Sequence, residues 1–213
     1  PDTKIINYKK IFKYSEYDYH LPMGSMGLYF QKNINQINLQ KKISYFSDSK
    51  IPDKIKKFRC GISWKSTNKI FGNKKSIELD SLKNILSNEN VEFINLQYSD
   101  ETKEINQIEK DLDKKIFVEH EIDCFNDIDG VAGLIKSCDF VVTVSNSNAH
   151  ISGKLGVKTF LLLPYNDGKL WYWGLNNDRD IVWYPSMLPI RQESINNWGS
   201  CLSKLYKEFE NYL

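Results

Sequence analysis

The sequence has few cysteines, and no two of them are spaced as the ligands of a metal site usually are. Its four cysteines lie far apart in the chain, and none belongs to a C-x-x-C or Cys/His cluster. This arrangement argues against a structural metal site and against a disulfide framework. We therefore expect no metal in the site, and we expect a reduced, cytoplasmic protein. The four residues are Cys60, Cys124, Cys138 and Cys201.

Long apolar runs and an excess of one charge are also missing. The longest apolar stretches are about as long as a strand, whereas a membrane span needs roughly 20 residues, and no apolar leader opens the chain. The 29 basic and 27 acidic residues are interspersed and give a net charge of +2. We therefore expect neither nucleic acid nor a membrane surface as a partner. Because the first residue is Pro1 rather than Met, we also expect a processed product or part of a longer protein.

Several familiar site motifs are absent as well. The chain has no G-x-G-x-x-G after its first regular strand and no G-x-x-x-x-G-K-[ST], which argues against a dinucleotide oxidoreductase and a P-loop NTPase. It also lacks H-E-x-x-H and G-x-S-x-G. We predict no cofactor.

A regular alternation of strands and helices begins at Arg59. Short, continuously apolar runs indicate strands that are covered by helices on both faces. Between them, apolar residues recur at helical spacing. The expected strands are 59–64, 92–97, 115–119, 139–144 and 158–163, and the expected helices are 78–88, 101–112, 127–138, 146–156 and 194–213.

Strand, helix and strand in repeated order predict an α/β domain with a doubly wound, mostly parallel, Rossmann-like sheet. A long C-terminal helix closes it. We assign residues 59–213 to this domain. Residues 1–58 are polar and rich in Tyr and Lys, and we interpret them as a connecting or appended region with one short helix near 24–30.

The stretch SNSNAH, residues 145–150, follows the fourth expected strand. In open α/β sheets, ligands bind at the carboxyl ends of strands, where the first turn of the next helix presents free N–H groups and a partial positive charge to an anion. Ser145, Asn146, Ser147 and Asn148 are therefore candidate phosphate-binding residues, although ordinary helix capping explains the same residue types. His150 is a candidate ligand contact or a structural histidine.

Other polar groups follow neighbouring strands. Lys65, Ser66 and Lys75 lie in the region after the first strand, which we expect to be a loop, and Gln97 ends the second strand. Because these strand ends share one edge, a common cleft is expected, while a solvated basic loop is the alternative for the lysines.

The run DIDGVAGLIKSCDFVVTVSNSNAHISGKLGVKTFLLLP, with GKLWYW, IVWYPSMLPIRQ and Trp198, resembles bacterial glycosyltransferases attached to tetratricopeptide repeats. These are relatives of heptosyltransferases and, more distantly, of O-GlcNAc transferases. RCGISWKS, KKSIELDSLKNIL, FINLQ and HLPMGSMGLYF extend the resemblance from about His20 to about Trp198.

This resemblance implies the C-terminal, donor-binding half of a GT-B glycosyltransferase, with a nucleotide diphosphate sugar as its ligand. It also implies metal-independent transfer with inversion at the anomeric carbon. The N-terminal half, which supplies the acceptor side and usually the catalytic base, and the tetratricopeptide repeats are missing from this chain. We therefore expect the isolated chain to be inactive.

The resemblance also assigns roles to single residues. Heptosyltransferases carry an Asp-Thr pair where this chain has Ser145 and Asn146, whereas the following Ala149-His150 matches. His150 is then the catalytic candidate, as a donor to a phosphate oxygen or to the sugar. Lys75 occupies a position that is often basic and is a better candidate than Lys65 for pairing with the diphosphate.

Both the aromatic residues and the function have alternative interpretations. The aromatic run WYW, 171–173, is interpreted mainly as structural, with a stacking wall for a base or sugar as the alternative; Trp183, Tyr184 and Pro185 are interpreted as structural. The alternatives to a transferase half are a non-catalytic nucleotide-binding or scaffold module, which the missing Asp favours, and a sugar-nucleotide epimerase.

Overall fold

The computed structural model describes residues 53–54, 56–166, 168–174 and 181–213. The expected helix near 24–30 and nearly all of the region 1–58 lie outside these residues.

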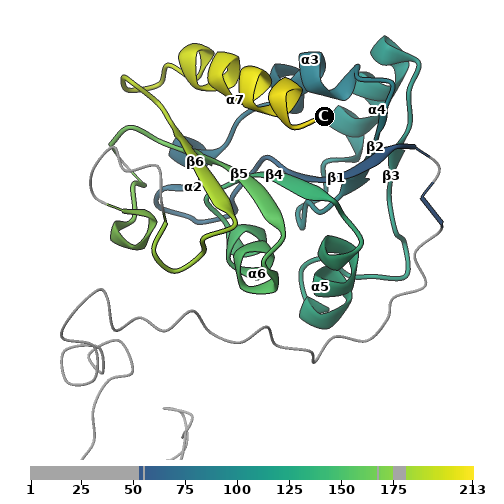
Figure 1. The fold of residues 1–213 in the computed structure, drawn as a ribbon, viewed down its shortest axis with the longest axis horizontal. Coiled ribbons are helices and arrows are strands. Elements are labelled where there is room, and N and C mark those ends of the chain that lie inside the picture. Colours follow the sequence, from purple (N-terminus) through teal and green to yellow (C-terminus); the bar gives the residue numbers. More distant parts are fainter. Residues whose placement is uncertain (1–52, 55, 167, 175–180) are drawn as a thin grey trace, which may run out of the picture. The chain divides into compact units, whose positions relative to one another are not determined.

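A six-stranded parallel sheet forms the centre of the domain (Figure 1). Its central strands are buried over most of their length, as expected for strands covered on both faces. The strands are β1 (Phe58–Ser63), β2 (Val91–Asn95), β3 (Ile116–Phe117), β4 (Phe140–Val144), β5 (Lys158–Leu163) and β6 (Met187–Arg191).

The order of the strands is β3-β2-β1-β4-β5-β6, and every pair is parallel. The chain builds outward from β1 in one direction through β2 and β3, and then returns to place β4 on the other side of β1. The sheet therefore has a topological switch point between β1 and β4, where loops that leave the two strands diverge and open a crevice.

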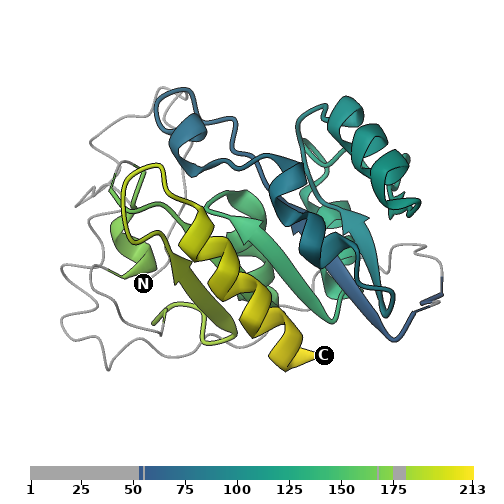
Figure 2. The same ribbon diagram turned by 90° about the horizontal axis from the view of Figure 1, so that it is seen from above.

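Helices cover both faces of the sheet, so the predicted Rossmann-like α/β class is confirmed. In Figures 1 and 2, α3, α4 and α7 lie on one face and α5 and α6 on the other. The helical segments are α2 (Gly72–Lys75), η4 (Leu79–Leu82), α3 (Lys83–Leu86), α4 (Thr102–Leu112), α5 (Ile128–Lys136), α6 (Ser147–Leu155), η5 (Trp171–Trp173) and α7 (Gly199–Tyr212).

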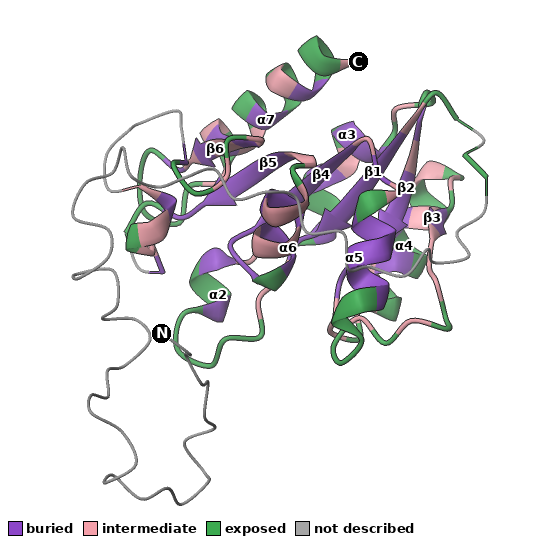
Figure 3. Cartoon of the chain, turned by 60° about the horizontal axis from the view of Figure 1, so that its bottom comes forward, coloured by how far each residue is buried: buried purple, intermediate pink, exposed green. Residues whose placement is uncertain are grey.

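Alternate residues of the strands supply the two sides of the core. Ile62 and Val142 belong to the apolar cluster under α3, α4 and α7, whereas Val141 belongs to the cluster under α5. Figure 3 shows the buried sheet between partly exposed helices. The two-sided core holds the ends of the central strands in fixed positions, and the site is built on those ends.

Three details differ from the sequence-based expectations. The segment expected to be a loop after β1 contains the short helix α2, and the C-terminal helix begins at Gly199 rather than residue 194. β6 was not predicted, because Pro189 interrupts its apolar pattern. A proline is compatible with this strand because β6 is at the edge of the described sheet.

Candidate functional site

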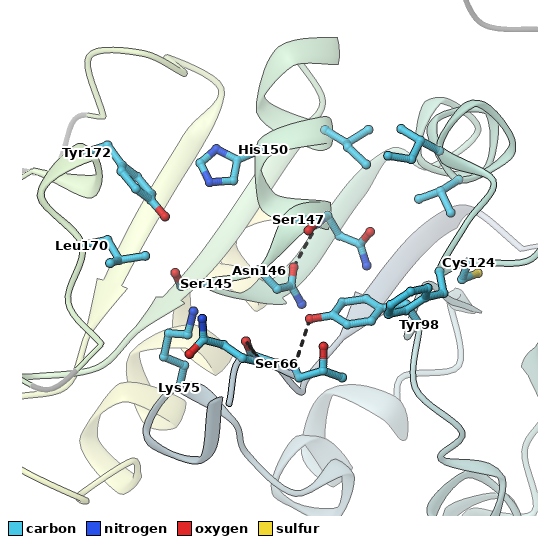
Figure 4. A pocket seen from close by; sticks show the side chains of 17 residues that line it. Ser66, Lys75, Tyr98, Cys124, Ser145, Asn146, Ser147, His150, Leu170 and Tyr172 are labelled. Atoms are coloured by element: carbon cyan, nitrogen blue, oxygen red, sulfur yellow. Dashed lines mark hydrogen bonds between the residues drawn. The ribbon is translucent and has the colours of Figure 1, made fainter. Parts of the chain in front are cut away.

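A pocket of about 520 Å³ opens at the carboxyl ends of β1 and β4, beside the switch point (Figure 4). Its walls come from the loop after β1, from α2, from the first turns of α5 and α6, and from the segment after β5. Of the nine residues predicted for the site, seven line this pocket: Ser66, Lys75, Ser145, Asn146, Ser147, Asn148 and His150. Lys65 and Gln97 do not.

Asn146 is the N-cap of α6. Its side-chain Oδ1 accepts hydrogen bonds from the amides of Asn148 at 3.0 Å and Ala149 at 3.4 Å. Helix capping, the alternative weighed for this stretch, is therefore what the structure shows for these two N–H groups. A phosphate at this helix would meet the first turn beside them rather than replace the cap.

The other half of the Asn146 amide connects the two central strands. Its Nδ2 donates to Ser63 Oγ at 2.8 Å and to the Lys65 carbonyl at 3.2 Å. The side chain is buried and its oxygen also accepts from Thr143 Oγ1 at 3.2 Å. One residue thus fixes the start of α6 relative to the end of β1.

Ser145 and Asn148 also use their side chains inside the protein. Ser145 Oγ accepts from Trp173 Nε1 at 2.8 Å, and Asn148 Nδ2 donates to the Leu96 carbonyl at 2.6 Å. Ser147, in contrast, is exposed at the first turn of α6. Of the four polar residues 145–148, Ser147 is therefore the one whose side chain lies free at the pocket surface.

Gln97 organises the end of β1 from behind the pocket. Its Oε1 accepts from Ser63 Oγ at 3.2 Å, Trp64 N at 3.0 Å and Lys65 N at 2.9 Å. Gln97 is buried, and these contacts hold the β1 loop against the end of β2.

Lys65 points away from the pocket into a cluster of carboxylates. It pairs with Glu101 at 2.8 Å and with Glu104. Burial opposes its charge, but the hydrogen bonds to these two carboxylates outweigh burial and raise the pKa of Lys65. Its charge is therefore neutralised locally, which makes Lys65 a poor phosphate ligand.

Lys75 is the cation of the pocket. Lys75 as a whole is only 6% exposed. The described part of the chain contains no hydrogen-bond or ion-pair partner for its amine. Burial lowers the pKa of Lys75. In Figure 4 the amine points into the pocket on the side of Ser145. Gly168 closes over the stem, since a Cβ there would lie 2.8 Å from Lys75 Cγ.

His150 lies in the second turn of α6, surrounded by aromatic rings. Its ring stacks on Trp173 with centroids 4.5 Å apart and lies 5.1 Å from the Tyr172 ring. Burial and then the nearby charge of Lys75 lower the pKa of His150. The imidazole is therefore neutral at pH 7, and a neutral ring can still donate one N–H to an anion.

The three residues of the WYW run have three different environments. Trp173 is fully buried, Tyr172 lines the pocket next to His150, and Trp171 is 66% exposed. The run is thus structural at its last residue and part of the pocket wall at its middle residue.

The end of the pocket nearest α5 is apolar and was not predicted. Tyr98 lies after β2, and its ring is 6.3 Å from that of Phe125, which precedes α5. Phe125 and Ile128 are 63% and 60% exposed at the pocket mouth. The available sequence signal was their position after two successive strands, at the same edge as the predicted polar residues.

The described lining residues include one ammonium group, Lys75, and no carboxylate. Within the described stretches no group of three or more His, Cys, Asp or Glu side chains is arranged to hold a metal ion. The pocket thus combines a positive, hydrogen-bonding end with an apolar end.

The described residues include no helix with the length and apolar character that a membrane span requires.

Comparison with known proteins gives limited similarity. No family model matches the chain. A stretch of 121 residues, 57% of the chain, is 28% identical to Protein FlbA of Caulobacter vibrioides. The matched stretch spans 20% of FlbA, so the chain corresponds to about a fifth of that relative's length.

Proposed function

We propose that this domain binds a nucleoside diphosphate sugar in the pocket between β1 and β4, as the donor-binding half of an inverting, metal-independent GT-B glycosyltransferase. The single observation that carries the proposal is the burial of Lys75 at the switch point without a carboxylate partner among the described residues. A buried ammonium is costly unless it is paired. A ligand with a concentrated negative charge would supply the missing partner.

The surroundings of Lys75 favour a diphosphate over a simple carboxylate. His150 and Ser147 add two hydrogen-bond donors on the α6 side of the pocket, where the helix dipole also favours negative charge. Three donors on two elements suit an anion with several oxygens. The arrangement is consistent with a pyrophosphate that bridges α2 and α6.

The apolar end suits the rest of such a ligand. A nucleobase has a flat apolar face, and aromatic side chains provide a sequence-tolerant surface for stacking. We assign the base to the end formed by Tyr98, Phe125 and Ile128. The sugar then points toward the open side of the pocket.

Glycosyl transfer requires hydrogen-bond donors around the phosphate that departs. When the bond to the anomeric carbon breaks, the nucleoside diphosphate leaves with both electrons and carries negative charge. Donors fixed in advance around the departing phosphate stabilise that charge in the transition state. In this domain Lys75 and His150 would do so, while an acceptor hydroxyl would lose its proton to a base outside the described lining.

Calorimetry with uridine, guanosine and adenosine diphosphates tests the proposal. We expect one of the three to bind, and Lys75→Met to weaken that binding by roughly 10- to 100-fold, since a hydrogen bond to a charged group contributes about 1.5–3 kcal/mol. Lys69→Met is the matched control, because Lys69 is an exposed lysine of the same loop outside the pocket lining. Equal binding by the wild type and Lys75→Met would refute the assignment.

A non-catalytic nucleotide-binding module is the second candidate. It is favoured by the absence of carboxylates among the described lining residues and by the use of Asn146 entirely for internal hydrogen bonds. Both candidates predict nucleotide binding. They differ in whether the protein with its neighbouring domains transfers or hydrolyses a bound sugar, which chromatography of the released nucleotide measures.

A further inference from the structure

The hydroxyl of Tyr184 lies 3.1 Å from Nδ1 of His150. Tyr184 comes from the turn before β6, 34 residues further along the chain, and it was interpreted from the sequence as structural. Its backbone is fixed on both sides: its amide donates to the Ile181 carbonyl at 2.9 Å, and its carbonyl accepts from the Met187 amide at 3.0 Å. The hydroxyl is therefore presented to His150 from a rigid turn.

A glycine in α6 makes this contact possible. A Cβ at Gly153 would lie 2.5 Å from Cγ of Tyr184 and 2.7 Å from the terminal methyl of Met187. Any larger residue at position 153 would push the tyrosine ring away. The absence of a side chain lets the ring pack across α6 and reach His150, one turn earlier.

The other contacts of His150 fix its ring plane. Trp173 stacks on the ring with an interplanar angle of 25°, and Trp173 is itself held by its hydrogen bond to Ser145. His150 lines the pocket and Tyr184 does not. With Nδ1 engaged by Tyr184 behind the ring, Nε2 is the nitrogen that the described residues leave for a ligand.

The direction of the Tyr184 hydrogen bond decides what Nε2 offers. If the phenol donates to Nδ1, Nε2 carries the proton and is a donor; in the opposite tautomer, Nε2 presents a lone pair. A lone pair repels phosphate oxygens, whereas an N–H binds them. Because burial, and then the charge of Lys75, disfavour a doubly protonated ring, the neutral Nε2–H form is the one that combines with an anion held by the lysine.

We propose that Tyr184 is a positioning residue that holds His150 in the Nε2–H tautomer, so that the imidazole donates to a phosphoryl oxygen of the bound diphosphate. This inference rests on the proposed function and adds a residue that does not itself touch the ligand. Tyr184 acts on the ligand only through the ring of His150.

Nitrogen NMR of the imidazoles provides a test that does not depend on activity. The chain has only three histidines, so a His150→Gln variant assigns the His150 signals directly. In the wild type we expect the Nε2–H tautomer. In Tyr184→Phe, which keeps the ring over Gly153 but removes the hydroxyl, we expect the Nδ1–H form to appear and the pKa of His150 to rise, because the donor to the neutral ring is lost.

Calorimetry with inorganic pyrophosphate and with the nucleoside diphosphate that binds best measures the consequence for the ligand. We expect Tyr184→Phe to weaken both about 3- to 10-fold, the effect of misplacing one neutral hydrogen bond. Gly153→Ala should act in the same direction by displacing the ring. Tyr206→Phe, which removes a hydroxyl from an exposed tyrosine of α7, is the control and should bind like the wild type.

The outcomes separate this inference from the proposed function. An unchanged tautomer in Tyr184→Phe, or a changed tautomer with unchanged affinity, would overturn the positioning role and leave nucleotide binding intact. No binding of any diphosphate by the wild type would overturn the proposed function and the role of Tyr184 together. A tautomer shift with the expected loss of affinity supports both.

Discussion

At the scale of single residues, the direction of the side chain distinguishes the two candidate lysines of the site. Lys65 and Lys75 lie ten positions apart and were both candidates for pairing with a diphosphate, yet only Lys75 lines the pocket. Lys65 is neutralised by Glu101 and Glu104. The difference depends on which way each side chain turns, which no local pattern encodes.

Lys75 should therefore lower stability while it serves binding. The described residues give the buried Lys75 no ion-pair partner. Replacing its ammonium by an apolar chain of similar length in Lys75→Met is expected to raise the free energy of unfolding of the ligand-free protein by about 1 kcal/mol. Urea denaturation measures this. A loss of stability in the variant would mean that the ammonium has a stabilising partner after all.

His150 predicts a pH dependence whose sign follows from its lowered pKa. In the unfolded chain the imidazole of His150 binds a proton near pH 6.5, whereas in the folded protein it does so only at lower pH. The contribution of neutral His150 to the free energy of unfolding is therefore fully present above pH 6.5. It is lost as the pH drops through the pKa of His150 in the folded protein. Among the described residues, Lys75, Tyr172 and Tyr184 are the titratable groups around the ring.

The contribution of His150 is measured by comparing wild type and His150→Gln in urea at pH 7.5 and pH 5. We expect the wild type to lose more stability than the variant over this interval. Parallel losses in the two proteins would show that other groups account for the pH dependence.

At the scale of elements, α6 is held in place by its cap. Asn146→Ala removes the acceptor of two helix amides and the donor to Ser63 and Lys65, and we expect it to lower the free energy of unfolding by about 2–4 kcal/mol. Asn146→Ser keeps a capping oxygen but loses the connection to β1, and should cost about 1 kcal/mol less. Equal effects of the two variants, measured by urea denaturation, would assign the whole contribution of Asn146 to the connection with β1.

The elements that the sequence predicted well are those with uninterrupted patterns. The runs that became β1, β4 and β5 are continuously apolar because helices cover both faces of the sheet. β6 was missed because Pro189 divides its pattern, and α2 because four residues are too few to show a helical period.

The candidate site was predictable only in part, for a similar reason. The residues that follow β4 were found because they are consecutive in the chain. The contact between His150 and Tyr184 spans 34 residues and depends on packing between α6 and the turn before β6. Such a contact has no periodic signature, and Trp183, Tyr184 and Pro185 were interpreted from the sequence as structural.

At the scale of the whole molecule, the strand order places the pocket. Because β4 returns to the side of β1 opposite β2, the loops after these two strands part, and polar groups from α2 and α6 meet across the opening. The described lining supplies donors but no carboxylate to deprotonate an acceptor.

We therefore expect this chain alone to bind a nucleoside diphosphate sugar without turning it over. Incubation with the sugar nucleotide, followed by chromatography, should show release of nucleoside diphosphate no faster than in buffer. A rate above that of buffer, abolished by Lys75→Met, would show that the described pocket contains the complete reaction machinery.

Pro189 lies in β6, which forms one margin of the described sheet. Hydrogen bonds from Thr159 N to Ser186 O and from Gln192 N to Leu163 O show that even-numbered residues of β6 face β5. Pro189 therefore faces outward, where it presents no N–H to an approaching strand. Among the described strands, this margin of the sheet is therefore poorly suited to edge-to-edge pairing, and we expect it to resist aggregation in a concentrated solution.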